Sequence, residues 1–233
     1  MISAKTKLQW YSVLSGGLIR IFGPQRAKLF FEHAYWRWEK LREGQLTNEF
    51  YEPFYTKAFG LSKSDYAGKD VLDVGCGPRG SLDWADEARS RVGIDPLADR
   101  YRKLNTRLKM ELVQGAAEQM PFEDASFDLV CCFNALDHVD DLQDSLDEIC
   151  RVLRPGGRFL LITDIHEAPA ICEPTVVGWD LASDLQERYD LVDEKRLRRL
   201  NGVYESVRSA IPFKEDSDEA YGLLQLHLIK RPV

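Results

Sequence analysis

Three closely spaced glycines follow an apolar run in a pattern that suits a nucleotide-binding turn. Residues 70–84, DVLDVGCGPRGSLDW, begin like a strand buried on both faces and pass directly into G-x-G-x-x-G at Gly75, Gly77 and Gly80. Glycine tolerates positive φ and lets a ligand approach the backbone, so this turn predicts a nucleotide site. Residues 81–90, which open on a serine, are predicted to form a helix directly after the turn.

Two aspartates near the turn indicate which nucleotide it holds. Asp73 lies two residues before Gly75, where a carboxylate would repel a pyrophosphate and favour a ligand with a cationic end. Asp95 lies 20 residues beyond Gly75, at the end of a predicted strand, where an acidic side chain accepts hydrogen bonds from ribose hydroxyls. S-adenosylmethionine joins an adenosine to a sulfonium and an amino acid and carries no phosphate. It is therefore the cofactor that we expect.

Two motifs resemble those of the class I S-adenosylmethionine-dependent methyltransferases. VLDVGCGPRG, residues 71–80, is similar to their first motif, and a strand followed by NALDHV, residues 134–139, a helix and RPGG is similar to a later part of their pattern. The resemblance spans roughly residues 68–165. It implies an α/β fold, a doubly wound, seven-stranded, mostly parallel Rossmann-like sheet. The last strand, residues 221–230, is then expected to run antiparallel between the fifth and sixth strands.

The resemblance also assigns cofactor contacts to residues at the ends of the predicted strands. They are Asp73, Gly75, Cys76 and Gly77 for the methionine end, Asp95 and Pro96 for the ribose, Ala116, Ala117 and Glu118 for the adenine, and Asn134 after the fourth strand. In the family an aspartate at the position of Ala116 accepts from the adenine amino group. Because this chain lacks that acceptor, the Ala117 backbone and the side chain of either Glu118 or Gln119 are expected to contact the ring instead.

His138 is the candidate catalytic residue. An imidazole can accept a proton near neutral pH, and this one would take it from a hydroxyl or amine acceptor as the methyl group moves. Methyl transfer to an aligned and desolvated nucleophile requires no base, however. The alternative is therefore that His138 packs beneath the site or caps the following helix.

The segment before the glycine turn is expected to be a helical N-terminal cap, residues 1–66, on a methyltransferase domain, residues 67–233. Residues 25–43 and 47–59 are predicted to be two helices of this cap, with Pro53 as a candidate break in the second. In the superfamily such helices shape the acceptor pocket. The substrate contacts expected by this analogy are Tyr51 and Tyr55, together with His166 from the loop after the fifth strand. The alternative for the two tyrosines is an ordinary place in the core.

Composition limits the class of protein. A length of 233 residues suffices for one α/β domain with a good core, and a net charge of −7 argues against a nucleic-acid partner. The five cysteines are odd in number and lack C-x-x-C spacing, which suggests reduced thiols in a cytoplasmic protein. The histidines, cysteines and carboxylates after the fifth strand match no metal-binding motif, so we expect no metal. The expected partner is a small-molecule acceptor.

Residues 8–22 are the most apolar stretch of the chain. They lack the uninterrupted centre and cleavage site of a signal peptide, and a membrane span needs about 20 apolar residues. A helix that packs on the body of the protein is expected, and a helix that lies on a membrane surface is the alternative.

Three other functions remain compatible with the sequence. The literal glycine pattern also suits a nicotinamide-dependent oxidoreductase. A module that binds the cofactor without catalysis would keep the same motifs. The basic, apolar N-terminal segment would suit a membrane-surface enzyme that acts on a lipid-linked acceptor.

Overall fold

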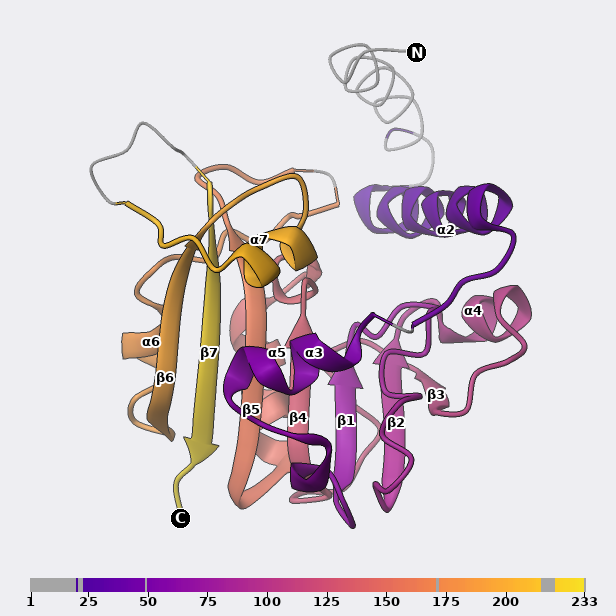
Figure 1. Cartoon of the computed structure of the whole chain (residues 1–233). Helices are drawn as coiled ribbons and strands as arrows, with labels where there is room; N and C mark the ends of the chain where they lie inside the picture. Colours follow the sequence, from indigo (N-terminus) through magenta and orange to yellow (C-terminus); the bar gives the residue numbers. More distant parts are fainter. Residues whose placement is uncertain (1–19, 21–22, 49, 171, 215–220, 233) are drawn as a thin grey trace.

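The computed structural model describes residues 20, 23–48, 50–170, 172–214 and 221–232. It contains one seven-stranded sheet in the order β3-β2-β1-β4-β5-β7-β6 (Figure 1). The strands are β1 (Asp70–Val74), β2 (Ser90–Asp95), β3 (Glu111–Gln114), β4 (Phe127–Phe133), β5 (Leu153–Ile165), β6 (Tyr189–Arg198) and β7 (Gly222–Lys230). Strand β7 pairs antiparallel with both neighbours, and β1 to β5 are mutually parallel. The predicted fold class and the place of the last strand are confirmed.

Helices cover both faces of the sheet. They are α2 (Pro24–Glu43), α3 (Glu52–Tyr55), α4 (Ala98–Leu104), α5 (Leu142–Val152), α6 (Leu181–Asp184) and α7 (Val203–Ser209), with short 3-10 helices η1 (Lys57–Phe59), η2 (Lys63–Asp65) and η3 (Leu136–His138). Successive strand residues point to opposite faces, so Leu72 and Val130 pack with α5 and α6, whereas Val71 and Leu129 pack with α3, α4 and α7. The two cores make the fold doubly wound.

The helix predicted for residues 81–90 is absent, and the segment forms a series of turns. Two polar side chains at the start of this segment bind other parts of the chain. The Ser81 hydroxyl donates to Asp73, and Asp83 Oδ1 accepts the backbone N–H of Met110 at 2.8 Å. The glycine turn therefore presents no helix N-terminus to a ligand, although that element binds the pyrophosphate in dinucleotide-binding folds.

Residues 47–59 form two short helices instead of the single predicted one. Helix α3 has Pro53 in its first turn and ends at Tyr55, and Thr56 has the non-helical φ and ψ of −115° and −86°. The Thr56 hydroxyl donates to the Glu52 carbonyl oxygen at 2.8 Å. The chain resumes as η1 in a new direction, which places the side chains of Phe54 and Tyr55 in the core.

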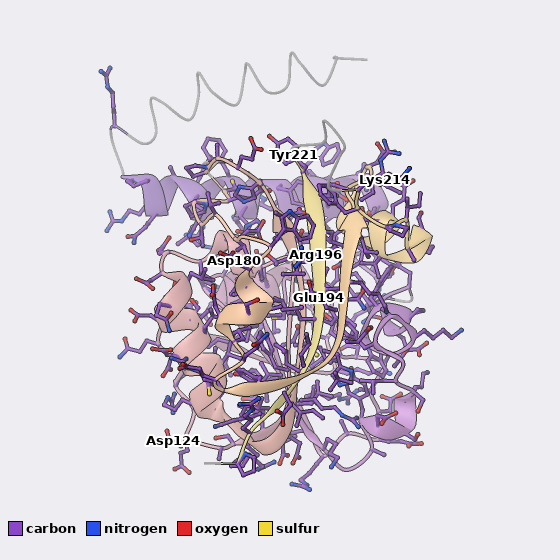
Figure 2. All side chains as sticks on the ribbon, turned by 90° about the vertical axis from the view of Figure 1, so that its left-hand side faces the viewer. Asp124, Asp180, Glu194, Arg196, Lys214 and Tyr221 are labelled. Carbon is purple, nitrogen blue, oxygen red and sulfur yellow. The ribbon has the colours of Figure 1, made fainter. Side chains whose placement is uncertain are left out.

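The outer strand β6 runs to Arg198, and the short helix α7 follows it. Figure 2 views the molecule from this edge and shows Glu194 and Arg196 on the strand. Arg196 Nε donates to Glu194 Oε1 at 2.7 Å, and its guanidinium lies 5.5 Å from the centre of the Trp179 ring. Charged side chains are common on edge strands because they discourage pairing with another chain.

The apolar segment of residues 8–22 lies outside the described residues, except for Arg20. Within the described residues, no helix combines the length and the apolarity that a membrane span requires. All five cysteines have free thiols.

Candidate functional site

The carboxyl ends of β1, β2 and β4 and one face of α2 enclose a cavity of about 290 Å³. Figure 1 shows α2 above the arrowhead of β1. The strand order reverses between β1 and β4, and open α/β sheets bind their ligands outside the carboxyl ends of the strands at such a point. The cavity is therefore the candidate site.

Eight of the predicted site residues line this cavity. They are Gly75, Asp95, Pro96, Ala116, Ala117, Glu118, Asn134 and His138. They come from the last residue of β2 and from the loops that follow β1, β2, β3 and β4, so parallel pairing of the strands brings distant parts of the sequence to one edge.

The turns after β1 and β4 approach each other closely on the cavity wall. Gly75 has a φ of +70°, and a Cβ atom built on it would lie 2.3 Å from the Cβ of Ala135. Asn134 also has a positive φ of 53°, and its N–H donates to the Ile162 carbonyl oxygen at 2.7 Å. Only glycine fits the first position, because a side chain there would overlap the second turn.

The Asp95 carboxylate faces the cavity and also holds the glycine turn. Its Oδ1 accepts the N–H of Leu97 at 2.8 Å, and its Oδ2 accepts the N–H of Gly77 at 3.3 Å. Burial raises the pKa of Asp95 to about 6, mainly because water no longer solvates the charge. A ligand that donates hydroxyl protons or carries positive charge would stabilise the ionised form.

The cavity wall is acidic. Its carboxylates belong to Glu32, Asp95, Glu118 and Asp140, whereas Lys28 is the one lysine or arginine among the described lining residues. Burial, followed by the nearby Asp95 charge, raises the pKa of Glu32. Such a wall favours a cationic ligand over one with phosphate groups.

Comparison with known proteins agrees with this geometry. Residues 72–161 match a family described as "Methyltransferase domain". A probable S-adenosylmethionine-dependent methyltransferase of Mycolicibacterium smegmatis is 37% identical over 99 residues, which cover 42% of this chain and 38% of that protein. Residues 72–161 are a class I S-adenosylmethionine-dependent methyltransferase domain. The sequence resemblance to this class is confirmed.

Two further proteins show how far the likeness extends beyond the methyltransferase domain. The ubiquinone/menaquinone biosynthesis C-methyltransferase UbiE of Hahella chejuensis is 38% identical over 122 residues, 46% of this chain and 47% of that protein. The chain thus spans less than half the length of either of these relatives. The crystal structure of YcgJ from Bacillus subtilis has a TM-score of 0.54 at 20% identity, over 76% of this chain and 99% of that one, and shows the same fold.

Asp73 does not line the cavity of the methyltransferase domain, contrary to the prediction. It is 1% exposed, and its Oδ2 accepts the hydroxyl protons of Tyr55, at 3.0 Å, and of Ser81. Burial raises the pKa of Asp73 to about 7. The carboxylate points along the opposite face of β1 from the cavity, and two hydroxyls occupy the positions where a cationic ligand was expected.

The burial of Asp73 can be tested by pH. Its folded pKa of about 7 lies above the ordinary 3.8, so the folded protein binds a proton that the unfolded chain releases. The free energy of unfolding should therefore decrease as pH rises from about 4 to about 7. Asp73→Asn cannot ionise at this position. Between pH 5 and pH 8, we therefore expect its free energy of unfolding, measured with urea, to fall less than that of the wild type, by on the order of 2 to 3 kcal/mol. Equal pH slopes in the two proteins would contradict this account.

Cys76 and Gly77 also lie off the cavity wall, although both were predicted to contact the cofactor. The Cys76 sulfur packs inside the core, 2.4 Å from a Cβ atom built on Gly93. The Trp36 ring covers Gly77, with Cζ2 at 3.4 Å from a Cβ built there. The turn therefore offers Gly75 to the cavity and directs the next two residues away from it.

Tyr51 and Tyr55, predicted as substrate contacts, lie in the core and not on the cavity wall. The Tyr51 ring is 5.1 Å from that of Tyr204 on α7, and the Tyr55 ring is 4.4 Å from that of Phe133 on β4. Both tyrosines are at most 5% exposed. The alternative of an ordinary place in the core is correct for both.

His166 lies beside the cavity and does not line it, contrary to the expectation of a substrate contact. It is 4% exposed and lies close to Asp137 and Glu173. Glu118 does line the cavity, but its Oε1 accepts the backbone N–H of Asp140 at 2.6 Å and of Asp141 at 3.2 Å. This carboxylate thus fixes the loop after β4.

Helix α2 contributes cavity residues that the sequence analysis did not assign to the site. Lys28 Nζ donates to Asp140 Oδ1 at 2.6 Å and to the His138 carbonyl oxygen at 2.9 Å, which fastens the helix over the loop after β4. Lys28 and Glu32 are four residues apart on the helix face that lines the cavity. That spacing is the signal that could have identified them, because it places both side chains on one face.

Proposed function

We propose that the protein transfers a methyl group from S-adenosylmethionine to an O, N or C atom of a small-molecule acceptor. The observation that carries the proposal is the acidic wall, with Glu32 and Asp95 facing a cavity at the carboxyl edge of a methyltransferase sheet. S-adenosylmethionine has a positive sulfonium and ammonium and no phosphate, so it complements this wall. The net charge of −7 supports a small acceptor rather than a nucleic acid.

Each part of the cavity wall has a proposed role in binding. The Asp95 carboxylate would accept the ribose hydroxyls, and the wall at residues 116–118 would contact the adenine. The backbone at Gly75 and Asn134 would lie against the methionine end. Helix α2, fastened by Lys28, would exclude water from above.

The proposed mechanism is an in-line displacement. When bound, S-adenosylmethionine supplies an electrophilic methyl group on a cationic sulfur. The cavity wall would align the acceptor with the methyl carbon, so that its lone pair forms the new bond as the carbon–sulfur bond breaks. His138, with a side chain 25% exposed on the wall, would take the proton of a hydroxyl or amine acceptor.

Two of the three alternative functions differ from the proposed one in what they bind or convert. A nicotinamide-dependent oxidoreductase is disfavoured by the acidic wall and by the missing helix N-terminus after the glycine turn. A non-catalytic module would bind the cofactor and leave every acceptor unmethylated.

The experiment is calorimetric titration of the full chain with S-adenosylhomocysteine, S-adenosylmethionine and NAD⁺. We expect one site per chain for the first two ligands and no heat of binding for NAD⁺. Binding of NAD⁺ without binding of S-adenosylhomocysteine would overturn the proposal. A subsequent assay of S-adenosylhomocysteine formation over a panel of hydroxyl, amine and carbon acids separates an enzyme from a binding module.

The proposal extends to the organisation of the chain and its compartment. Residues 1–66 would act as a cap on a domain of residues 67–233, as the position of α2 over the cavity supports. The five free thiols support a reducing compartment such as the cytoplasm.

A further inference from the structure

Three side chains of metal-binding types meet beside the cavity, between the loops that follow β4 and β5. Asp137 lies in η3, and His166 and Glu173 lie after β5. One possible ligand atom from each lies within 4.8 Å of the others. The neighbouring strands β4 and β5 are parallel, so their carboxyl ends bring the two loops together. Thr175 joins them, because its N–H donates to the Asp137 carbonyl oxygen at 3.2 Å.

The cluster contains buried polar atoms that have no hydrogen-bond partner. Asp137 is 0% exposed, and neither of its carboxylate oxygens has a partner. His166 is 4% exposed, and its Nε2 also has none. Buried polar groups are normally paired, and a buried carboxylate without a partner is strongly unfavourable. The cluster therefore lacks a positive or proton-donating group.

His166 is oriented as metal-binding histidines are. Its Nδ1 lies 2.9 Å from the Ala168 carbonyl oxygen, which fixes the ring proton on that nitrogen. The lone pair is then on Nε2, the atom without a partner. A backbone carbonyl that holds the far side of the imidazole is a frequent outer contact of metal-binding histidines.

The charges around the cluster leave an acidic excess. Arg199 Nε lies 2.6 Å from Asp164 Oδ1 and neutralises that neighbouring carboxylate. No lysine or arginine among the described residues forms an ion pair with Asp137 or Glu173, and the His138 Nε2 is 4.0 Å from Asp137 Oδ2. A divalent cation would balance the two remaining carboxylates.

We propose that Asp137, His166 and Glu173 bind a divalent transition-metal cation. One imidazole nitrogen and two carboxylates suit Mn²⁺ or Zn²⁺, whereas Mg²⁺ and Ca²⁺ prefer oxygen ligands alone. Metal–ligand bonds of about 2.1 Å require the three atoms to move closer together. Rotation of the half-buried Glu173 side chain would bring them together. This inference does not depend on the proposed methyl transfer.

The test is titration of the full chain, first stripped of metal with a chelator, with MnCl₂ in the presence of excess Mg²⁺. Free Mn²⁺ is followed by electron paramagnetic resonance. We expect one Mn²⁺ per chain and a loss of affinity of at least ~100-fold in Asp137→Asn and in His166→Ala. Glu167→Gln is the matched control, because this exposed carboxylate is next to His166 and outside the cluster, and it should keep the wild-type affinity.

Thermal unfolding gives a second measurement that detects a fold disturbed by mutation. Without metal, Asp137→Asn should melt at a higher temperature than the wild type, because it removes a buried charge that has no partner. With MnCl₂, the melting temperature of the wild type should rise and that of Asp137→Asn should not. Wild-type protein that binds no Mn²⁺, or Mn²⁺ binding that Asp137→Asn leaves unchanged, would overturn the proposal.

Discussion

Gly75→Ala should lower the affinity for S-adenosylhomocysteine at least ~100-fold and destabilise the protein by about 2 to 5 kcal/mol. The new Cβ would lie 2.3 Å from that of Ala135, so the turns after β1 and β4 must separate. The φ of +70° adds a cost of about 1 to 2 kcal/mol for any residue with a Cβ. Both turns form the cavity wall, so their separation changes the site itself. Urea unfolding and calorimetric titration measure the two effects.

Gly156→Ala is the matched control for this substitution. Gly156 has nearly the same φ, +75°, but a Cβ built there meets no atom within 4 Å. It lies in β5 and not on the cavity wall. The control should therefore lose only about 1 to 2 kcal/mol and keep the wild-type affinity. If Gly75→Ala and Gly156→Ala bound S-adenosylhomocysteine with equal affinity, the cofactor would not bind in this cavity.

Asp95→Ala should weaken the binding of S-adenosylhomocysteine by about 100-fold. A hydrogen bond to a charged group contributes about 1.5 to 3 kcal/mol, and the proposed ribose contact contains such bonds. The substitution also leaves the N–H groups of Gly77 and Leu97 without their acceptor, so it costs about 1 to 3 kcal/mol of stability. Calorimetry at a temperature where the variant is folded measures the affinity.

Asp83→Ala is the control for Asp95→Ala. It removes hydrogen bonds to the backbone without removing a side chain of the cavity wall. Asp83 is also buried and also accepts two backbone N–H groups, those of Lys109 at 3.0 Å and Met110 at 2.8 Å, but it does not line the cavity. The two variants should lose similar stability, and only Asp95→Ala should lose affinity. If Asp95→Ala retained full affinity, the ribose assignment would be wrong.

The sheet could be predicted from sequence because its signals are local. The apolar run of residues 127–133 has the length and composition of a central parallel strand, and it forms β4 with the same bounds. The helix expected at residues 81–90 failed for a long-range reason. Ser81 and Asp83 have the side chains of capping residues, but in the fold they bind Asp73 and Met110.

The predicted site residues line the cavity where backbone position alone decides their place. The residues directly after β1 to β4 line the cavity because parallel strands end at one edge. Asp73 lies off the cavity wall because it shares its face of β1 with Val71, which packs on the α3 side. The spacing of Lys28 and Glu32 places them on one face of the predicted helix, but their place on the cavity wall depends on where α2 lies over the sheet.

Buried carboxylates account for the preference for a cationic ligand, as predicted, but they are not the predicted one. Asp73, from which this preference was predicted, is held in the fold by two hydroxyls. Asp95 and Glu32 take its place, because both carboxylates line the cavity and burial raises the pKa of each. A cation between them would lower both pKa values and stabilise the complex.

A crystal structure of the protein with S-adenosylhomocysteine tests the central claim most directly. The account predicts density in the cavity beneath α2, with the ribose hydroxyls within hydrogen-bond distance of the Asp95 carboxylate and the homocysteine end near Gly75. Density for the ligand at any other place, with this cavity filled by protein side chains, would contradict it.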